Sequence, residues 1–308
     1  MTGKYATERL CADAGGIARA ARILAGGGLV AVPTETVYGL AARAVSETAV
    51  AGIYLAKGRP SFNPLIVHVA DMAMARRLAV VSPAAEALAA AHWPGPLTLV
   101  LPRREDAGLA EAVSAGLDTV ALRMPAHPAM RELIGAVGAP LAAPSANRSG
   151  FISPTRADHV LGSLDGRIDA VLDGGECPRG LESTIVAVRA DGSADVLRPG
   201  PIDLGEMAKK GAIEAPGQLA SHYAPGKPMR LDATKVAPGD FLIGFGAIAG
   251  DCTLSASGDL EEAATRLYAC LHEAARAPQA SIAVAPIPEQ GIGRAINDRL
   301  RRAATPPA

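Results

Sequence analysis

Short apolar runs bounded by Gly or Pro alternate with stretches of helical periodicity through the first two thirds of the chain. Such runs are typical of buried strands, and we expect strands at 29–32, 65–69, 97–101, 119–122, 140–143, 170–172, 184–188 and 195–197. Capping residues and helical spacing predict helices at 7–25, 46–57, 82–92, 127–137 and 155–164. Because the later strands follow one another closely, the pattern favours a twisted mixed α/β sheet over a purely parallel one.

The pattern changes near residue 211. Residues 215–228 contain three prolines and two glycines, which predicts a linker. Expected strands at 241–243 and 282–284, with helices at 259–276 and 297–304, then form a smaller α/β, Rossmann-like unit. We therefore divide the chain into a main domain at 1–210, a linker at 211–228 and a C-terminal domain at 229–308.

One string in the C-terminal unit resembles a dinucleotide-binding motif. Residues 244–249 read GxGxxA directly after an expected strand. A dinucleotide site also needs a helix N-terminus at that point, and the following residues do not open a clear helix. The string is therefore interpreted as a Gly-rich turn.

The overall charge is nearly balanced, with 30 basic and 31 acidic residues in a chain of 308. This balance excludes the global basicity of a protein that coats nucleic acid, although a local basic cleft remains possible. No apolar run reaches membrane-spanning length, and the first residues lack the apolar segment of a secretory signal. We expect a soluble, cytoplasmic protein with no membrane partner.

The cysteines are widely scattered, at Cys11, Cys177, Cys252 and Cys270, and they form no CxxC pair. The six histidines are not at metal-ligand spacing either. We therefore expect reduced thiols, with neither a disulfide framework nor a zinc site.

Polar and cationic residues recur at the expected strand ends. Lys57 and Arg59 lie one residue apart in a loop stiffened by Gly and Pro, which suits polyphosphate. Arg123 ends a strand, and its planar guanidinium suits a ligand carboxylate. Ser145 and Asn147 end another strand and could contact phosphate, ribose or base. Taken singly, each could be a solvated helix end or a turn, but together they predict one shared ligand site.

Nine motifs in a fixed order then give a family resemblance: PTETVYGL, KGRP, NPLIVH, WPGPLT, RMP, PSAN, SPT, GLEST and LRPGP. Over residues 26–201 the chain resembles the threonylcarbamoyl-AMP synthase family, the YrdC-like proteins. SHYAP at 221–225 and GIGRAINDRL at 291–300 resemble the linker and C-terminal domain of the longer, two-domain members. The resemblance implies a twisted mixed sheet with a large concave basic cleft.

The same resemblance implies an activity. L-threonine, bicarbonate and ATP would form L-threonylcarbamoyladenylate and pyrophosphate, for the threonylcarbamoyladenosine modification of tRNA. Mg²⁺ would arrive with ATP; no residue of the chain is assigned as its ligand, and whether protein groups also bind it stays open at this point. The product would pass to a separate tRNA threonylcarbamoyl-transfer complex, without stable tRNA binding by this chain.

The residues that the resemblance implies fall into two sets. The ATP set consists of Lys57, Arg59, Asn63, Thr119, Ser145, Asn147, Ser153, Arg198 and Tyr223. The threonine set consists of Thr34, His68, Arg123, Ala143 and Ser183, with Thr36 as an additional possibility. Lys57 and Arg59 would be catalytic, because they would neutralise charge on the phosphates. Tyr223 would fold back over the nucleotide, which makes the linker a candidate lid.

Two other functions remain open at this point. An RNA-binding module could use the same cations, although near-zero net charge and few aromatic residues oppose it. A transferase that adenylates carbamate from carbamoyl phosphate would differ from the main hypothesis in not depending on threonine.

Overall fold

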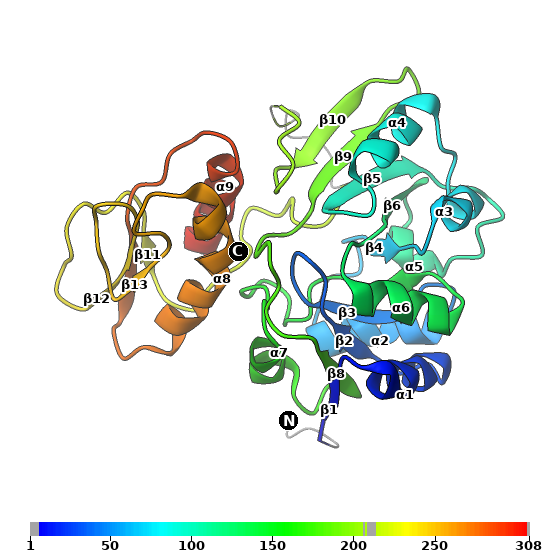
Figure 1. Ribbon diagram of the computed structural model, residues 1–308, viewed down its shortest axis with the longest axis horizontal. Helices are drawn as coiled ribbons and strands as arrows, with labels where there is room; N and C mark the ends of the chain where they lie inside the picture. The colour runs from blue at the N-terminus through cyan, green and yellow to red at the C-terminus, as the bar shows by residue number, and fades with distance from the viewer. Residues whose placement is uncertain (1–5, 206, 208–213, 307–308) are drawn as a thin grey trace.

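The computed structural model describes residues 6–205, 207 and 214–306, which form two β-sheets with helices packed around them (Figure 1). The larger sheet has ten strands in the order β1-β8-β2-β3-β7-β4-β6-β5-β9-β10, and the smaller has four, in the order β11-β14-β12-β13. The boundary predicted between residues 210 and 211 lies outside the described residues, so the domain division stays a prediction.

The ten-stranded sheet combines parallel and antiparallel pairs, which confirms the predicted mixed sheet. For example, β4 pairs with β6 in parallel, whereas β5 pairs with β6 antiparallel. Its strands are β1 (Glu8–Cys11), β2 (Val30–Val32), β3 (Gly39–Arg43), β4 (Ile66–His68), β5 (Leu97–Pro102), β6 (Thr119–Arg123), β7 (Leu141–Ala142), β8 (Ala170–Asp173), β9 (Thr184–Val188) and β10 (Ala194–Arg198). The buried core around this sheet consists mainly of Ala, Val, Leu and Ile side chains.

Helices of the larger unit begin and end where capping residues permit. They are α1 (Ala14–Ala25), α2 (Glu47–Lys57), α3 (Met72–Leu78), α4 (Pro83–His92), α5 (Glu111–Ser114), α6 (Pro128–Val137) and α7 (Ala157–Leu164). Ser46 caps α2 by accepting a hydrogen bond from the Ala49 amide, as predicted. Gly58 ends the same helix in the left-handed conformation, which places Lys57 and Arg59 on either side of a sharp turn.

Three predicted elements need correction. The single helix expected at 7–25 is wrong, because Glu8–Cys11 forms the edge strand β1 against β8, and α1 begins only at Ala14. No strand was expected between residues 32 and 46, but Gly39–Arg43 forms β3, which pairs with β2 and β7. The helix expected from Thr155 begins at Ala157, so Ser153 does not lie at its first turn.

The smaller unit has a parallel sheet with two longer helices. It contains β11 (Met229–Arg230), β12 (Asp240–Gly244), β13 (Cys252–Thr253), β14 (Ser281–Val284), α8 (Leu260–Arg276) and α9 (Gly293–Ala304). Gly246 takes a positive φ of 59° in the segment after β12, which agrees with a turn. Cys252 and Cys270 form a disulfide, so the expectation of reduced thiols is wrong for this pair, which β13 and α8 bring together.

The two units are packed against each other through α8 and α9, which lie on the side of the small sheet that faces the larger unit (Figure 1). Val37, Ile152 and Leu181 of the larger unit belong to the same buried cluster as the core of the smaller one. The rings of His159 in α7 and His272 in α8 are stacked 3.9 Å apart at this contact. Among the described residues, no helix is both long and apolar enough to cross a membrane.

Candidate functional site

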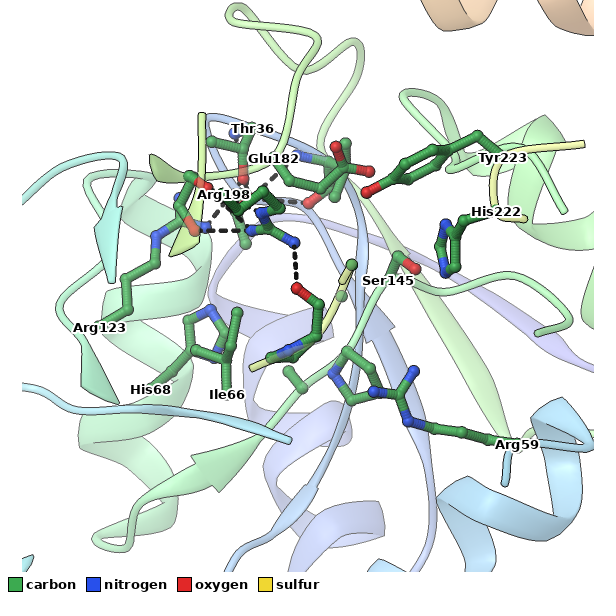
Figure 2. Close-up of a pocket in the computed structure, with 18 residues that line it drawn as sticks. Thr36, Arg59, Ile66, His68, Arg123, Ser145, Glu182, Arg198, His222 and Tyr223 are labelled. Atoms are coloured by element: carbon green, nitrogen blue, oxygen red, sulfur yellow. Dashed lines mark hydrogen bonds between the residues drawn. The ribbon is translucent and has the colours of Figure 1, made fainter. Parts of the chain in front are cut away.

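A cavity of about 50 Å³ lies where the ends of several central strands meet the linker (Figure 2). In Figure 2, Arg59 lies on one side of it, Arg123 and His68 lie on the other, and Ser145 lies between them. Most of the lining residues are polar or charged, and the full set is Thr34, Thr36, Val37, Gly39, Arg59, Ile66, His68, Arg123, Ala143, Pro144, Ser145, Glu182, Ser183, Arg198, Pro216, Gly217, His222 and Tyr223.

Arg123, the last residue of β6, is held by a buried ion pair. Its Nη2 donates to Glu35 Oε1 at 2.6 Å, its Nη1 donates to Thr36 Oγ1 at 2.9 Å and its Nε donates to the Gly95 carbonyl at 3.3 Å. Burial would raise the pKa of Glu35, but the charge and hydrogen bond of Arg123 outweigh it and lower that pKa. The guanidinium is therefore fixed in orientation, with further N–H groups available to a ligand.

Two more predicted threonine-site residues lie beside Arg123. Thr34 Oγ1 accepts from the amides of Thr36 and Val37, at 3.1 and 3.2 Å, so a local turn fixes its hydroxyl. The Nδ1 atom of His68 is buried without a hydrogen-bond partner among the described residues. Burial, and then the Arg123 charge, lower the pKa of His68 to about 3, so this imidazole is neutral near pH 7. An unsatisfied buried nitrogen in a cavity wall is a reason to expect a polar ligand there.

The opposite side of the cavity carries Arg59 and, behind it, Lys57. Arg59 donates to the carbonyl oxygens of Asn63 and Pro64, at 3.2 and 2.9 Å. Its pKa is lowered by burial to about 10, so it stays charged near pH 7. Lys57 donates to the carbonyl oxygens of Ser145 and Asn147. It therefore supports the loop from behind and is not part of the cavity lining.

Arg198, at the end of β10, forms the third cationic group of the wall. Its Nε and Nη2 donate to the Ser183 carbonyl, at 3.1 and 2.9 Å, and Nη2 also donates to Ser183 Oγ at 3.1 Å. Gly217 of the linker approaches closely, because a Cβ there would lie 2.9 Å from Arg198 Cδ and 3.1 Å from Tyr223 Oη. Its φ of +84° also favours glycine, so the linker backbone can pack directly on this arginine.

Comparisons with known proteins show which family the chain belongs to. A family model described as "Telomere recombination" matches residues 22–200, and one described as "Threonylcarbamoyl-AMP synthase, C-terminal domain" matches residues 181–305. A Bacillus subtilis protein named threonylcarbamoyl-AMP synthase is 40% identical, over 97% of this chain and 95% of that protein. This chain belongs to the threonylcarbamoyl-AMP synthase family.

Relatives and solved structures support membership over almost the full length. A Pyrococcus abyssi threonylcarbamoyl-AMP synthase is 39% identical over 92% of this chain and 93% of that protein. A crystal structure of P. abyssi Sua5 complexed with L-threonine has a TM-score of 0.86 at 37% identity, covering 97% of both chains. The structure of a P. abyssi Sua5 variant, in which a histidine and the tyrosine after it are replaced by alanine, has a TM-score of 0.87 at 34% identity, covering 97% of this chain and 96% of that one.

The structure brings most, but not all, of the predicted site residues into the cavity wall of this family member. Those in the wall are Thr34, Thr36, Arg59, His68, Arg123, Ala143, Ser145, Ser183, Arg198 and Tyr223. Lys57, Asn63, Thr119, Asn147 and Ser153 are not among the lining residues. The Oδ1 atoms of Asn63 and Asn147 are nevertheless buried without a partner among the described residues. The ligand contacts of all these residues stay predictions.

Two ionisable wall residues, Glu182 and His222, were not among the site residues predicted from the sequence. Glu182 accepts from Ser153 Oγ at 2.6 Å, from Tyr268 Oη at 2.8 Å and from Arg299 Nε at 2.9 Å. Burial would raise the pKa of Glu182, but the charges of Arg299 and Arg198 lower it to about 2. His222 lies in the linker and forms part of the wall. Glu182 lies in the motif GLEST and His222 in the motif SHYAP, but the importance of these two residues depends on partners far away in the sequence.

The described residues do not show the large basic cleft that the resemblance implies. The cavity has only about 50 Å³, and Pro216, Gly217, His222 and Tyr223 of the linker make up part of its wall. Three arginines face this small space, so its chemistry suits a ligand with several negative charges.

Proposed function

We propose that this protein forms L-threonylcarbamoyladenylate and pyrophosphate from L-threonine, bicarbonate and ATP. The observation that carries the proposal is the single cavity with Arg123 and His68 on one side and Arg59 on the other, and with Arg198 also in its wall. The first side suits an amino-acid carboxylate, and the second suits phosphates. The names of relatives about 40% identical over nearly the whole chain support the same reaction.

The chemistry requires two anions to meet. The threonine amine combines with bicarbonate, releasing water, or with CO₂, releasing a proton, to give a carbamate. A carbamate oxygen then attacks the α-phosphorus of ATP, and pyrophosphate leaves. The carbamate is already anionic, so no general base is needed at the phosphorus step. Positioning of well-oriented groups can lower a barrier by about 7–11 kcal/mol. Arg59 and Arg198 would stabilise charge that develops on the phosphates.

The position of Lys57 suggests a supporting part in the same step. Burial and then the nearby Arg59 charge hold the pKa of Lys57 well below its usual value. Its ammonium group bonds to the backbone of the Ser145–Asn147 loop. We therefore expect Lys57 to hold this loop in place, and to contact phosphate directly only if ATP shifts the loop.

The size of the cavity implies that the linker moves. Pockets for small molecules are usually about 300–1,000 Å³, whereas this cavity has about 50 Å³ with Tyr223 in its wall. ATP and threonine can enter together only if the linker residues withdraw, so the linker is proposed to act as a lid. Closure would then keep water away from the labile adenylate.

Mg²⁺ would be bound mainly through the phosphates of ATP. Among the described residues, no group of three or more His, Cys, Asp or Glu side chains is gathered in a way that could hold a metal ion. Glu182, the carboxylate in the cavity wall, already accepts hydrogen bonds from three side chains. Magnesium is commonly bound through substrate phosphates in this manner.

The product would be handed to a separate tRNA threonylcarbamoyl-transfer complex in the cytoplasm. This chain is not expected to bind tRNA stably.

The test combines purified protein with ATP, Mg²⁺ and bicarbonate, and measures pyrophosphate release with and without L-threonine. Release that requires both threonine and bicarbonate is expected, with L-serine and L-valine as controls for the amino-acid side chain. Release supported by carbamoyl phosphate without threonine would instead indicate the carbamoyl-adenylating transferase. Salt-dependent RNA binding with no pyrophosphate release would indicate the RNA-binding module.

A further inference from the structure

A second space, which we call the α7–α8 cleft, lies where helix α7 of the larger unit meets the end of helix α8. Its volume is about 400 Å³, whereas the cavity described above has about 50 Å³. The larger value falls in the usual range of small-molecule pockets. No described residue lines both spaces, so the α7–α8 cleft is a separate candidate for a ligand.

Three exposed arginines give the α7–α8 cleft its charge. Arg148, Arg167 and Arg276 line it, and no Asp or Glu is among its described lining residues. Within the described chain none of the three forms an ion pair, whereas the nearby Arg156 is paired with Glu176. Guanidinium groups without a carboxylate partner are suited to phosphate, which accepts their N–H groups in pairs.

These charges come from both units of the protein. Arg276 is the last residue of α8, and its Nη2 atom lies 3.5 Å from the place that a Cβ of Gly162 in α7 would occupy. Arg167 lies just after α7, and Arg148 lies in the segment before it. The Arg276 side chain therefore reaches the unit that carries the other two arginines, and one anion can contact groups from both.

Aromatic rings make up another part of the lining. The Phe151 side chain is 47% exposed, and His159 and His272, whose rings are stacked, also line the cleft. Burial, and to a lesser extent the charge of Arg276, lower the pKa of His159 to about 3 and that of His272 to about 4. Both imidazoles are therefore neutral near pH 7. Neutral rings of this kind are surfaces on which a nucleobase stacks.

We propose that the α7–α8 cleft binds a nucleoside phosphate, with the three arginines on the phosphate and with Phe151 and the two histidines against the base. A single nucleotide is favoured over a nucleic acid strand, because Glu176 and Glu273 line the adjoining cavity, which shares Arg276 with the cleft. A strand that continued in that direction would bring its phosphates beside these carboxylates. The site goes beyond the proposed function and does not depend on it.

Histidine signals in NMR spectra of the full-length protein report which space a nucleotide occupies. AMP is the probe, because it carries one base and one phosphate group. His159 and His272 line the α7–α8 cleft, whereas His68 and His222 line the catalytic cavity. Replacing each histidine singly by glutamine assigns its signal. AMP is expected to shift the His159 and His272 signals with a Kd below about 1 mM.

Two substitutions test the arginines. Arg167→Met and Arg276→Met should each raise the Kd for AMP about tenfold, because each removes a charged donor to the phosphate. Both side chains are exposed, so little loss of stability is expected. Arg131→Met is the matched control, because Arg131 is an exposed arginine of α6 that lines neither space, and it should leave the Kd unchanged.

Two further ligands test the class of molecule. Inorganic phosphate lacks the base and should bind at least about tenfold more weakly than AMP. A single-stranded RNA oligonucleotide should bind no more tightly than AMP, because its further phosphates find no cations beyond the cleft. Phosphate as tight as AMP would overturn the nucleoside part of the proposal, and far tighter RNA at the same histidines would overturn the restriction to one nucleotide.

The site itself is rejected if no histidine signal shifts, or if only those of His68 and His222 do, since AMP would then occupy the catalytic cavity alone. An unchanged Kd in both Arg167→Met and Arg276→Met, or an equal loss in Arg131→Met, would also reject it. If one of the two substituted proteins does not fold, the other decides. Absence of pyrophosphate release would count against the proposed function only, because the shifts do not require turnover.

Discussion

The two sides of the cavity are built in different ways. Arg123 and His68 end neighbouring parallel strands, β6 and β4, and both belong to the ten-stranded sheet. The wall opposite depends on the linker, where His222 and Tyr223 are held by helices of the C-terminal unit. The first side is therefore fixed by the core of one domain, whereas the second is completed only when three separate parts of the chain meet.

Their electrostatics differ as well. Arg123 has a carboxylate partner in Glu35, which balances its charge inside the protein. The hydrogen bonds of Arg59 go to backbone carbonyl oxygens, and those of Arg198 go to carbonyls and the Ser183 hydroxyl. These partners satisfy N–H groups without cancelling the positive charge of Arg59, whereas the charge of Arg198 is partly balanced by Glu182. The comparison indicates that the Arg123 side orients a singly charged group of a ligand, whereas the Arg59 side can neutralise a highly charged group.

The largest effect is expected from a substitution on the Arg123 side of the cavity, where Glu35 balances the charge of the arginine. Arg123→Met leaves Glu35 buried without its cation, and losing one partner of a buried ion pair typically costs about 3–5 kcal/mol. The free energy of unfolding, measured with urea, should fall by that order. Threonine use in the pyrophosphate assay should fall far more than ATP affinity.

A second substitution separates stability from ligand binding at this side. In the double variant with Glu35→Gln, much of the stability should return, because no unpaired charge is left, while threonine use stays lost. If ATP and threonine affinities fell equally in Arg123→Met, the assignment of Arg123 to the threonine carboxylate would be rejected.

A smaller effect is expected on the Arg59 side of the cavity. Here turnover should fall while threonine binding is kept, the reverse of the result expected for Arg123. Arg59→Met removes a charge whose hydrogen bonds to phosphate would each contribute about 1.5–3 kcal/mol, so kcat should fall by roughly 10- to 100-fold. The affinity for threonine, measured by calorimetry, should stay close to that of the wild type. Loss of threonine binding with normal turnover at saturating threonine would contradict the division into two sides.

The smallest expected effect is on how the free energy of unfolding changes with pH. It compares His68 on the Arg123 side with His222 on the linker side. Burial is the main cause that lowers the pKa values of His68 and His222 to about 3, whereas an unfolded histidine titrates near 6.5. The unfolded state therefore binds more protons below that pH. The stabilising contribution is complete above about pH 6.5 and is lost as the pH falls toward 3, by about 1.4 kcal/mol per pH unit for each histidine.

Urea unfolding at several pH values between about 7.5 and 5 measures this slope. His68→Gln should flatten it, because this side chain stays buried unless the sheet itself opens. His222→Gln should flatten it less if the linker opens before global unfolding and lets His222 protonate. Equal flattening by the two substitutions would show that the linker side is as firmly fixed as the sheet side.

Local signals in the sequence account for most of the elements. Ser46, Ser82 and Gly58 mark helix ends because their effects act within a few residues. The edge strand β1 was missed because its residues ERLC do not alternate between buried and exposed positions, and they become a strand only by pairing with β8. The disulfide was missed for a similar reason, since β13 and α8 must first pack together.

The sequence by itself determined the polar residues at strand ends, because strand ends and Gly or Pro turns are encoded locally. From these residues, and from the ordered motifs around them, it indicated a shared site and the family. Only the tertiary structure decided that Glu182 joins the cavity to Tyr268 and Arg299, which lie 86 and 117 residues further along the chain. It also decided that Glu35 balances Arg123 and that α9 holds the linker. For Arg123 and Glu182 the partners lie far away along the chain, so no short stretch of sequence around either residue contains both the charge and its partners.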